Sequence, residues 1–368
     1  MLRKEKFGHG QPQNMRENKM NEYLFDNFDG KKMASLIPHW SSIRDNIIPT
    51  PLANSLDLSS HCSNKCWFCN HKFSNKSGLG HLSDETFAHL IDVYKHFGVK
   101  SSCISGGGES LENPRCEDYF EEIIKAGTAI GIITNGRIYR KVPKECRFIN
   151  VSVNAADETT YSEMACVDKR YFFEVLENIG QWVNDGHCVT YKVMITDKNM
   201  SPGLLIDSVK MADSLGVENV LFRFAMLPYD QVNKKGADEY IHINTLESEL
   251  YTSQIDILRK NFPDMNISMP FERYDRYSVK YVPFRCIGAL INFVVLWDGN
   301  IVLCSDWRTS QKMVLCHISE LKEQWGSQKH WDIVNSVDPT KCCRCSFSIH
   351  ARLVEELIFN DYPNQFFI

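Results

Sequence analysis

The chain has 368 residues, of which 43% are apolar and 24% charged, and its net charge is −5. These values are typical of a globular protein with a substantial buried core. The absence of a basic block argues against a nucleic-acid partner, and the longest apolar runs are too short to cross a membrane. The polar start lacks the apolar segment of a signal peptide, so a cytoplasmic location is the default expectation.

After a polar, mixed-charge extension over residues 1–48, strand-like and helix-like stretches alternate through residues 49–245. Strands are predicted over 52–59, 101–106, 129–136, 148–154, 188–196 and 219–226. Helices are predicted over 83–98, 116–127, 169–186 and 204–216, the first beginning at the N-cap Ser83 and ending at Gly98. Repeated β-then-α units predict an α/β fold with a parallel sheet. Six units, fewer than the eight of a closed barrel, predict a partial (β/α)6 barrel.

The rest of the chain has a different pattern. Residues 246–283 are predicted to be a connecting helix and linker, and residues 284–368 a small C-terminal domain. In that domain, Asp298 and Gly299 form a tight-turn signal between two alternating strands. A final helix is expected over 349–360, so the domain is a β-hairpin plus a helix.

Unusual polar residues follow several of the predicted strands. Three cysteines follow the first strand, the segment SGGGES (105–110) follows the second, and TNG (134–136) follows the third. Ser152 and Asn154 lie on the fourth. The carboxyl ends of parallel strands meet at one edge, where such folds bind ligands. Within SGGGES, the glycines allow close backbone approach and Glu109 offers a carboxylate to a cationic group.

The three cysteines after the first strand, Cys62, Cys66 and Cys69, have the spacing C-x3-C-x2-C. Thiolates are the ligands of iron–sulfur clusters, and three of them leave one iron of a cubane cluster open. The same thiols could bind zinc with His61 or His71 as the fourth ligand, although structural zinc sites more often use two separated pairs. The isolated cysteines are expected to be small buried hydrophobes; they are Cys103, Cys116, Cys146, Cys166 and Cys188.

The segment CSNKCWFC resembles the signature loop of the radical SAM superfamily, and GGGE resembles its methionine-binding motif. Together with ITNG and VSVNAADETTY, the resemblance covers about residues 52–226. It implies a radical SAM core over 49–245, in which Cys62, Cys66 and Cys69 hold a [4Fe–4S] cluster that binds S-adenosylmethionine. One electron, from a reducing partner such as flavodoxin or ferredoxin, would then release a 5′-deoxyadenosyl radical that abstracts a hydrogen from the substrate.

The resemblance also implies which other residues bind S-adenosylmethionine. Phe68 is expected near the adenine and Ser152 near the ribose, while Gly107, Gly108 and Glu109 are expected at the methionyl ammonium. Asn154 is expected in the same site, although many relatives have an acid at this position. Ala165 stands where those relatives often have an arginine; Arg170 or Arg223 are candidates to replace it.

A second set of cysteines lies in the C-terminal segment. Cys286 and Cys304 flank the predicted hairpin, and Cys342 and Cys345 form a C-x2-C pair. Four such thiolates could form a zinc ribbon or a fully ligated [4Fe–4S] cluster. The spacing resembles the Twitch domain, a shortened relative of the SPASM domain, which implies one auxiliary [4Fe–4S] cluster on these four cysteines. Cys343 is an alternative to Cys342, and Cys316 is expected to be a packed strand residue.

The hairpin layout resembles that of radical SAM 2-deoxy-scyllo-inosamine dehydrogenases. This implies oxidation of a small hydroxylated metabolite, such as a sugar or aminocyclitol, with the auxiliary cluster as electron acceptor. Arg223, Tyr229 and Asp306, with Arg308, are candidates to hold hydroxyls or accept a proton. The alternative is a peptide-modifying enzyme that forms crosslinks or epimerises residues, for which the polar N-terminal segment is short. A more remote alternative is a zinc-binding protein without catalysis.

Overall fold

The computed structural model describes residues 36–69, 80–196, 199, 201, 203–225, 245–269, 283–308, 310–342 and 345–359. Its strands are β1 (Ala53–Leu56), β2 (Ser101–Ser105), β3 (Ala129–Thr134), β4 (Ile149–Ser152), β5 (Val189–Ile195), β6 (Asn219–Phe224), β7 (Asn266–Ser268), β8 (Asn292–Val295), β9 (Asn300–Val302) and β10 (Val314–His317). The longer helices are α3 (Asp84–Phe97), α4 (Cys116–Lys125), α5 (Glu158–Ala165), α6 (Arg170–Asn184), α7 (Leu204–Ser214), α9 (Thr245–Asn261), α13 (Gln328–Ser336) and α14 (Ser348–Val354). The short ones are α2 (Ile37–Trp40), α11 (Gly288–Ile291) and α12 (Leu321–Gln324).

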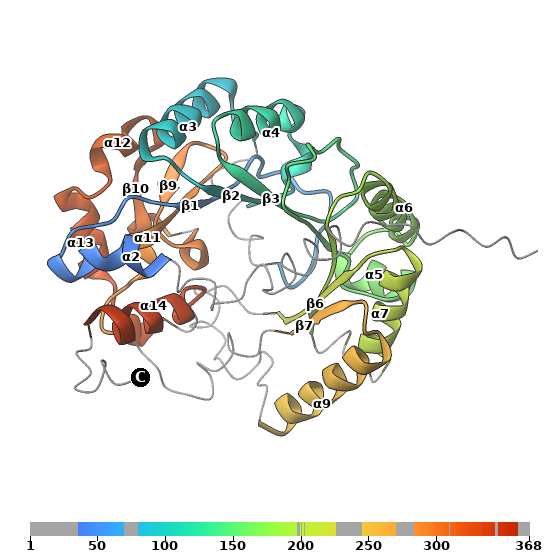
Figure 1. The fold of residues 1–368 in the computed structure, drawn as a ribbon. Coiled ribbons are helices and arrows are strands. Elements are labelled where there is room, and N and C mark those ends of the chain that lie inside the picture. The colour runs from blue at the N-terminus through green and yellow to red at the C-terminus, as the bar shows by residue number, and fades with distance from the viewer. Residues whose placement is uncertain are drawn as a thin grey trace, which may run out of the picture.

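The predicted parallel sheet is confirmed. Strands β1 to β6 lie side by side in chain order, and each pair is parallel. The sheet curves, and α3, α4, α6 and α7 lie on its outer side (Figure 1). This is the arrangement expected of a partial barrel, and it brings the loops that follow β1, β2 and β3 to one edge.

The sheet continues beyond these six strands at both ends. β7 pairs in parallel with β6, although its residues were predicted to belong to a linker. At the other end, β8 pairs in parallel with β1, so the C-terminal hairpin of β8 and β9 extends the same sheet. The prediction of a hairpin is confirmed, but the hairpin does not form a sheet of its own. Pairing between strands that lie far apart in the sequence cannot be predicted from local sequence patterns.

The prediction that residues 1–48 are a polar extension is wrong for its last part. α2 and the 3-10 helix η2 (Ser41–Asp45) bury Trp40 and Ile43 in the core. The indole of Trp325 donates to the carbonyl of Pro49 and fixes the segment that leads into β1. Two apolar residues three positions apart were too little periodicity to predict this packing.

Local capping explains why the helices begin and end where they do. The Ser83 hydroxyl accepts a hydrogen bond from the Thr86 amide at the start of α3, and Gly98 ends that helix with φ +64°. Both were predicted. α5 was not predicted, although Asp157 caps it by accepting from the Thr159 and Thr160 amides.

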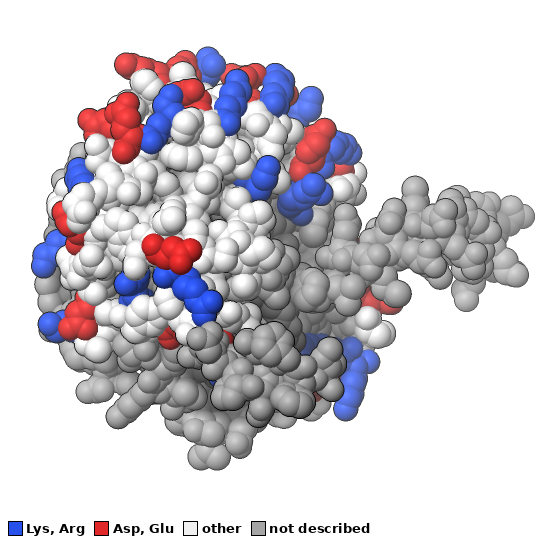
Figure 2. All heavy atoms as spheres, turned by 60° about the vertical axis from the view of Figure 1, so that its left-hand side comes forward, with Lys and Arg blue, Asp and Glu red and all other residues white. Residues whose placement is uncertain are grey.

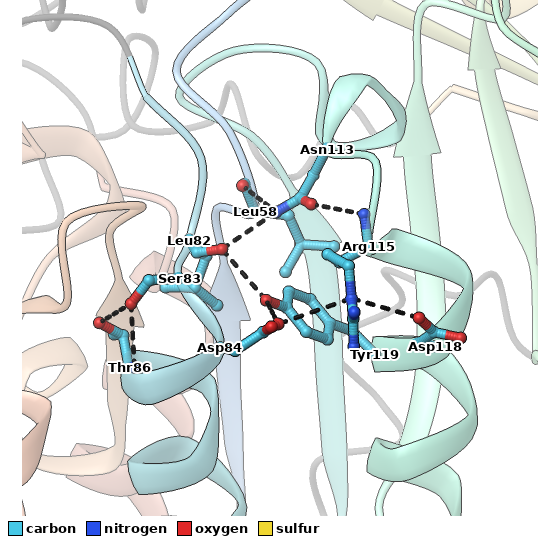
Figure 3. A network of polar contacts seen from close by, with 9 residues as sticks. All are labelled: Leu58, Leu82, Ser83, Asp84, Thr86, Asn113, Arg115, Asp118 and Tyr119. Carbon is cyan, nitrogen blue, oxygen red and sulfur yellow. Dashed lines mark hydrogen bonds and ion pairs between the residues drawn. The ribbon is translucent and has the colours of Figure 1, made fainter.

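A partly buried polar network joins the end of β1 to α3 and α4 (Figure 3). The Asn113 amide donates to the Leu58 carbonyl at 2.9 Å, and its oxygen accepts from the Arg115 amide. The Tyr119 hydroxyl donates to Asp84 at 2.7 Å. Because Leu58 directly precedes the cysteine loop, this network fixes the position from which that loop departs.

On the face shown in Figure 2, the described basic and acidic side chains are interspersed rather than segregated by sign. None of the helices among the described residues is long and apolar enough to span a membrane.

Candidate functional site

The cysteine loop and the glycine-rich loop are joined by backbone hydrogen bonds. The Gly108 amide donates to the Ser59 carbonyl at 3.0 Å, and the Glu109 amide donates to the His61 carbonyl at 2.6 Å. These bonds hold the residues just before Cys62 against the loop that follows β2. Two of the motifs predicted at the strand ends therefore form one structure.

Gly108 has to be glycine for a steric reason. A Cβ atom at this position would lie 2.2 Å from the His61 carbonyl oxygen and 2.5 Å from the Ser60 carbonyl carbon. Both are backbone atoms that cannot move aside as a flexible side chain can. The missing side chain is what lets the two loops lie in contact.

Glu109 ties the third strand to the same structure. Its carboxylate accepts hydrogen bonds from the Leu111 amide at 3.1 Å, the Thr134 hydroxyl at 2.9 Å and the Asn135 amide at 2.6 Å. Burial raises the pKa of this carboxyl to about 7, and the three donors oppose that rise. A carboxylate has about four acceptor sites, so one remains for a cationic ligand.

The cysteine loop is anchored by residues that the sequence did not point to. The Ser63 amide donates to Glu112 at 2.6 Å, and Arg137 donates to the Ser63 carbonyl at 2.8 Å. The Lys65 amide donates to the Ala165 carbonyl at 2.9 Å. The position that often holds an arginine in relatives therefore contributes its backbone here. These contacts involve residues far apart in sequence, which no local pattern reveals.

The three thiols lie close together, in surroundings that disfavour their deprotonated form. Burial, followed by the Glu109 carboxylate, raises the pKa of Cys62 to about 12. Burial also raises the pKa of Cys66, and Cys69 and Cys62 raise it further. The Asn135 amide donates to the Cys62 sulfur at 3.7 Å. A bound cation is needed to hold such a set deprotonated.

Three neighbouring thiolates are a donor set that a cubane iron–sulfur cluster can use. Among the described residues, no three Cys, His, Asp or Glu side chains converge as ligands of one ion. In a cubane cluster each thiolate binds its own iron, so the sulfurs need to be neighbours without meeting at one point. His71, one of the two candidate zinc ligands, lies outside the described residues.

The remaining predicted cofactor residues lie around this edge of the sheet. Phe68 lies within the cysteine loop, edge-on to Trp67, and Ser152 is the last residue of β4. Asn154 has φ +64°, and its side-chain oxygen accepts from the Met194 amide at 2.9 Å. Asn154 therefore joins the ends of β4 and β5, a structural contact that the sequence did not suggest. Its contact with a cofactor stays a prediction.

The C-terminal cysteines also approach one another. Burial raises the pKa of Cys304, and Asp306, Cys286 and Cys345 raise it further. These three thiols therefore lie within electrostatic reach. Cys342 donates to the Asp338 carbonyl at 3.9 Å, while Cys343 lies outside the described residues.

The predicted catalytic residues are found in different settings. Both carboxylate oxygens of Asp306 accept from Ser346, at 2.9 and 3.0 Å, which joins the Cys304 segment to Cys345. Arg223 lies on β6, in register with Met194 of β5. Tyr229 lies outside the described residues. Proton transfer by any of the three stays a prediction.

The isolated cysteines match expectation only in part, since Cys103 and Cys188 are half-buried rather than buried. Every cysteine within the described ranges is free of disulfides, and Cys116 and Cys146 are buried. Cys316 is buried in β10, as predicted. Cys166 was predicted to be buried but is exposed, because it ends α5 in the left-handed conformation with φ +54°.

A cavity of about 340 Å³ adjoins the cysteine loop. It is lined by His61, Ser63, His81, Glu112, Arg137 and Ile138. The rings of His61 and His81 lie 4.8 Å apart, and burial followed by the charge of His61 lowers the pKa of His81. The cavity therefore offers polar groups directly beside Cys62.

Comparison with known proteins connects this geometry to a family. The model of the Radical SAM superfamily matches residues 56–196. A "Probable GTP 3′,8-cyclase" of Pyrobaculum aerophilum is 27% identical over 169 residues, which are 43% of this chain and 53% of that protein. The chain thus spans about half the length of this curated relative.

Solved structures give a likeness over most of the chain. SuiB of Streptococcus suis, bound to precursor peptide SuiA, has a TM-score of 0.62 at 14% identity, with 94% of this chain and 85% of that chain covered. Native anSMEcpe with bound AdoMet has a TM-score of 0.57 at 15% identity, with 80% of this chain and 89% of that chain covered. At these identities the likeness shows the fold alone.

Proposed function

We propose that this chain, whose residues 56–196 match the model of the Radical SAM superfamily, oxidises a small hydroxylated metabolite. In this proposal, Cys62, Cys66 and Cys69 hold a [4Fe–4S] cluster that binds S-adenosylmethionine. The observation that carries the cluster and S-adenosylmethionine part of the proposal is the joining of the cysteine loop to the glycine-rich loop through Gly108 and Glu109.

When bound, the cluster and S-adenosylmethionine supply the radical that removes a hydrogen atom from the substrate. The chain's own residues prepare the site for them. Gly108 lets the glycine-rich loop lie against the cysteine loop, Glu109 has one acceptor site left for the methionyl ammonium, and Asn135 donates to the Cys62 sulfur. A hydrogen bond to a ligand sulfur raises the reduction potential of a cluster, so Asn135 is a positioning and tuning residue.

We further propose an auxiliary [4Fe–4S] cluster on Cys286, Cys304, Cys345 and either Cys342 or Cys343. The mutual influence of Cys304, Cys286 and Cys345 supports it. Asp306 contributes by holding Ser346, and with it Cys345, beside the Cys304 segment. A fully ligated cluster would accept the substrate electron without binding the substrate.

Iron and sulfide analysis after anaerobic reconstitution tests the ligand sets. Two cubane clusters require about eight irons per chain. Changing Cys66 to Ala should reduce this to about four, and so should changing Cys304 to Ala. A colourless, iron-poor protein that retains zinc would contradict both assignments.

A second candidate function is peptide modification. The fold is similar to that of SuiB, whose structure is titled as bound to precursor peptide SuiA. Product analysis separates the two candidates. A keto product with S-adenosylmethionine converted to 5′-deoxyadenosine supports metabolite oxidation, whereas a mass change in a peptide supports modification.

A further inference from the structure

The hydrogen bonds of the sheet reveal which side chains face away from the helices. The Tyr94 hydroxyl of α3 lies 2.9 Å from both the Asn54 and Ser102 side chains, so these two face the helices. Successive side chains in a strand alternate between faces. Asp57 and Ser105, each three residues further on, therefore face the inner side.

The same argument applies to β4. A Cβ at Gly136 would meet Val151 at 2.5 Å and Val175 of α6 at 3.0 Å, so Val151 packs on the helix side. Its neighbour Asn150 therefore faces the inner side. Leu56 is in register with Ile104, which places Asp57 beside Ser105.

The register continues across the next strands. Ser105 pairs with Ile133, and Ile133 pairs with Asn150. Asp57 and Asn150 thus lie in one row across the inner face, separated by three strand spacings or about 14 Å along the sheet.

Arg308 enters this row from the C-terminal segment. It forms an ion pair with Asp57 and donates to the Ser105 carbonyl at 3.1 Å. The side chains of Arg308 and Asp57 are only 7% and 1% exposed. Burial raises the pKa of Asp57 to about 6, and Arg308 opposes that rise. The two charges cancel within the row.

Several buried polar atoms in this row lack a hydrogen-bond partner within the described part of the chain. They are Asp57 Oδ2, Arg308 Nε and both the oxygen and the nitrogen of the Asn150 amide. The Gly107 backbone also acts on the Asp57 carboxylate and lowers its pKa, so Asn150 is the clearest unpaired group. Asn150 is 1% exposed. Proteins rarely bury polar groups unpaired, and such groups gather where a ligand completes them.

We propose that Asp57, Arg308 and Asn150 bind the hydroxyl groups of a small uncharged polyol substrate. The proposal rests on the metabolite-oxidising function above and specifies its substrate class. Asp57 offers an acceptor, Arg308 a donor and Asn150 one of each; a hydroxyl group both donates and accepts, so it satisfies all of them. Because the ion pair carries no net charge, these three residues favour a neutral ligand. Lys192 and Arg223 also lie within electrostatic reach of Cys103 on the inner face, so binding of the anionic probe alone is the competing outcome. Because the side chains of Asp57, Arg308 and Asn150 are at most 7% exposed, the row favours a small molecule over a peptide main chain.

The test is calorimetric titration of the reconstituted enzyme with S-adenosylmethionine and without reductant. The probes are myo-inositol and glucose as neutral polyols, gluconate as an anion and glucosamine as a cation. Saturable binding of at least one neutral polyol is expected. Asn150→Leu should weaken it by about tenfold or more. Because the Asn150 amide has no partner to lose among the residues that the structure describes, this variant should keep or raise the melting temperature.

Asn150→Ala serves as a second variant if the larger side chain prevents folding. Ser102→Ala is the matched control, since Ser102 is equally buried but faces α3 and should leave binding unchanged. The proposal is overturned if neither neutral polyol binds, if only a charged probe or a peptide binds, or if the Asn150 variants bind as wild type does. None of these results affects formation of 5′-deoxyadenosine under reductant, which tests the proposed function separately.

Discussion

At the scale of single residues, two glutamates beside the cysteine loop differ in the number of hydrogen bonds that their carboxylates accept. Glu109 accepts three hydrogen bonds with its two oxygens, whereas Glu112 accepts a hydrogen bond from the Ser63 amide with one of its oxygens. A glutamine has a single acceptor oxygen. It can therefore replace Glu112 but not Glu109, for which the Asn135 amide would face the new NH2 group.

We expect Glu109→Gln to weaken the binding of S-adenosylmethionine by about tenfold or more. The variant loses the bond to Asn135 and the negative charge available to the ammonium. Glu112→Gln is the matched control and should stay within about twofold of wild type. Equilibrium binding to the anaerobically reconstituted proteins measures both. Equal affinities for the two variants would show that Glu109 does not act as proposed.

His330 gives a pH dependence of stability. It is fully buried, its Nε2 lies 2.7 Å from the Ala289 carbonyl, and its Nδ1 accepts from the Gly326 amide. Burial lowers the pKa of His330 to about 4, from an ordinary value of 6.5. The folded state therefore binds this proton less readily than the unfolded state does. The stability it contributes is present above pH 6.5 and is lost as the pH falls towards 4.

The loss amounts to about 3 kcal/mol over that interval. His330→Leu should be less stable than wild type at pH 7, because it leaves the Ala289 carbonyl and the Gly326 amide unpaired. Its disadvantage should shrink as the pH falls. Urea denaturation of both proteins at pH 7 and pH 5 measures this, and a constant difference between them would refute the assignment.

At the scale of elements, alanine substitutions at two glycines are expected to have opposite effects. Gly108→Ala places a Cβ 2.2 Å from backbone and should separate the two loops. A Cβ added at Gly180, within α6, would meet no described atom within 4 Å outside its own helix, so alanine there should stabilise the helix by about 1 kcal/mol. Gly108→Ala should abolish binding of S-adenosylmethionine while Gly180→Ala retains it. Binding and thermal unfolding of both variants test this, and retained affinity in Gly108→Ala would contradict the role of the loop contact.

The elements that build the site were the most predictable part of the chain. The β-then-α alternation, the Ser83 cap and the glycine stops are local signals, and they placed the motifs at the strand ends. Glu112 and Arg137 could not be found this way, because they reach the cysteine loop only through the fold. Asp57 and Arg308 are 251 positions apart, and nothing local connects them.

At the scale of the whole molecule, the C-terminal segment completes the sheet. β8 pairs with β1 along its full length, and Phe293, Val294 and Val295 are 0% exposed. Burial of each such side chain stabilises a protein by about 1.5–3 kcal/mol. A change in the sequence pattern predicted a domain boundary at residue 284. Such a change does not reveal that the segments before and after the boundary share one core.

A chain that ends at residue 283 should therefore aggregate, because β1 would become an exposed edge strand with an uncovered apolar face. The matched control is the full chain with Cys286 and Cys304 both changed to Ala, which loses the proposed cluster ligands but keeps β8. It should remain soluble and folded. Size-exclusion chromatography and circular dichroism compare the two, and a soluble, native-like 1–283 fragment would show that the parts fold independently.

The central claim is that Cys62, Cys66 and Cys69 hold a cluster that cleaves S-adenosylmethionine. Its most direct test is anaerobic incubation of the reconstituted chain with S-adenosylmethionine and dithionite, followed by chromatography of the nucleosides. We predict 5′-deoxyadenosine from the wild-type chain and from Cys304→Ala, and none from Cys66→Ala. A wild-type chain with its full iron content that never forms 5′-deoxyadenosine would contradict the account.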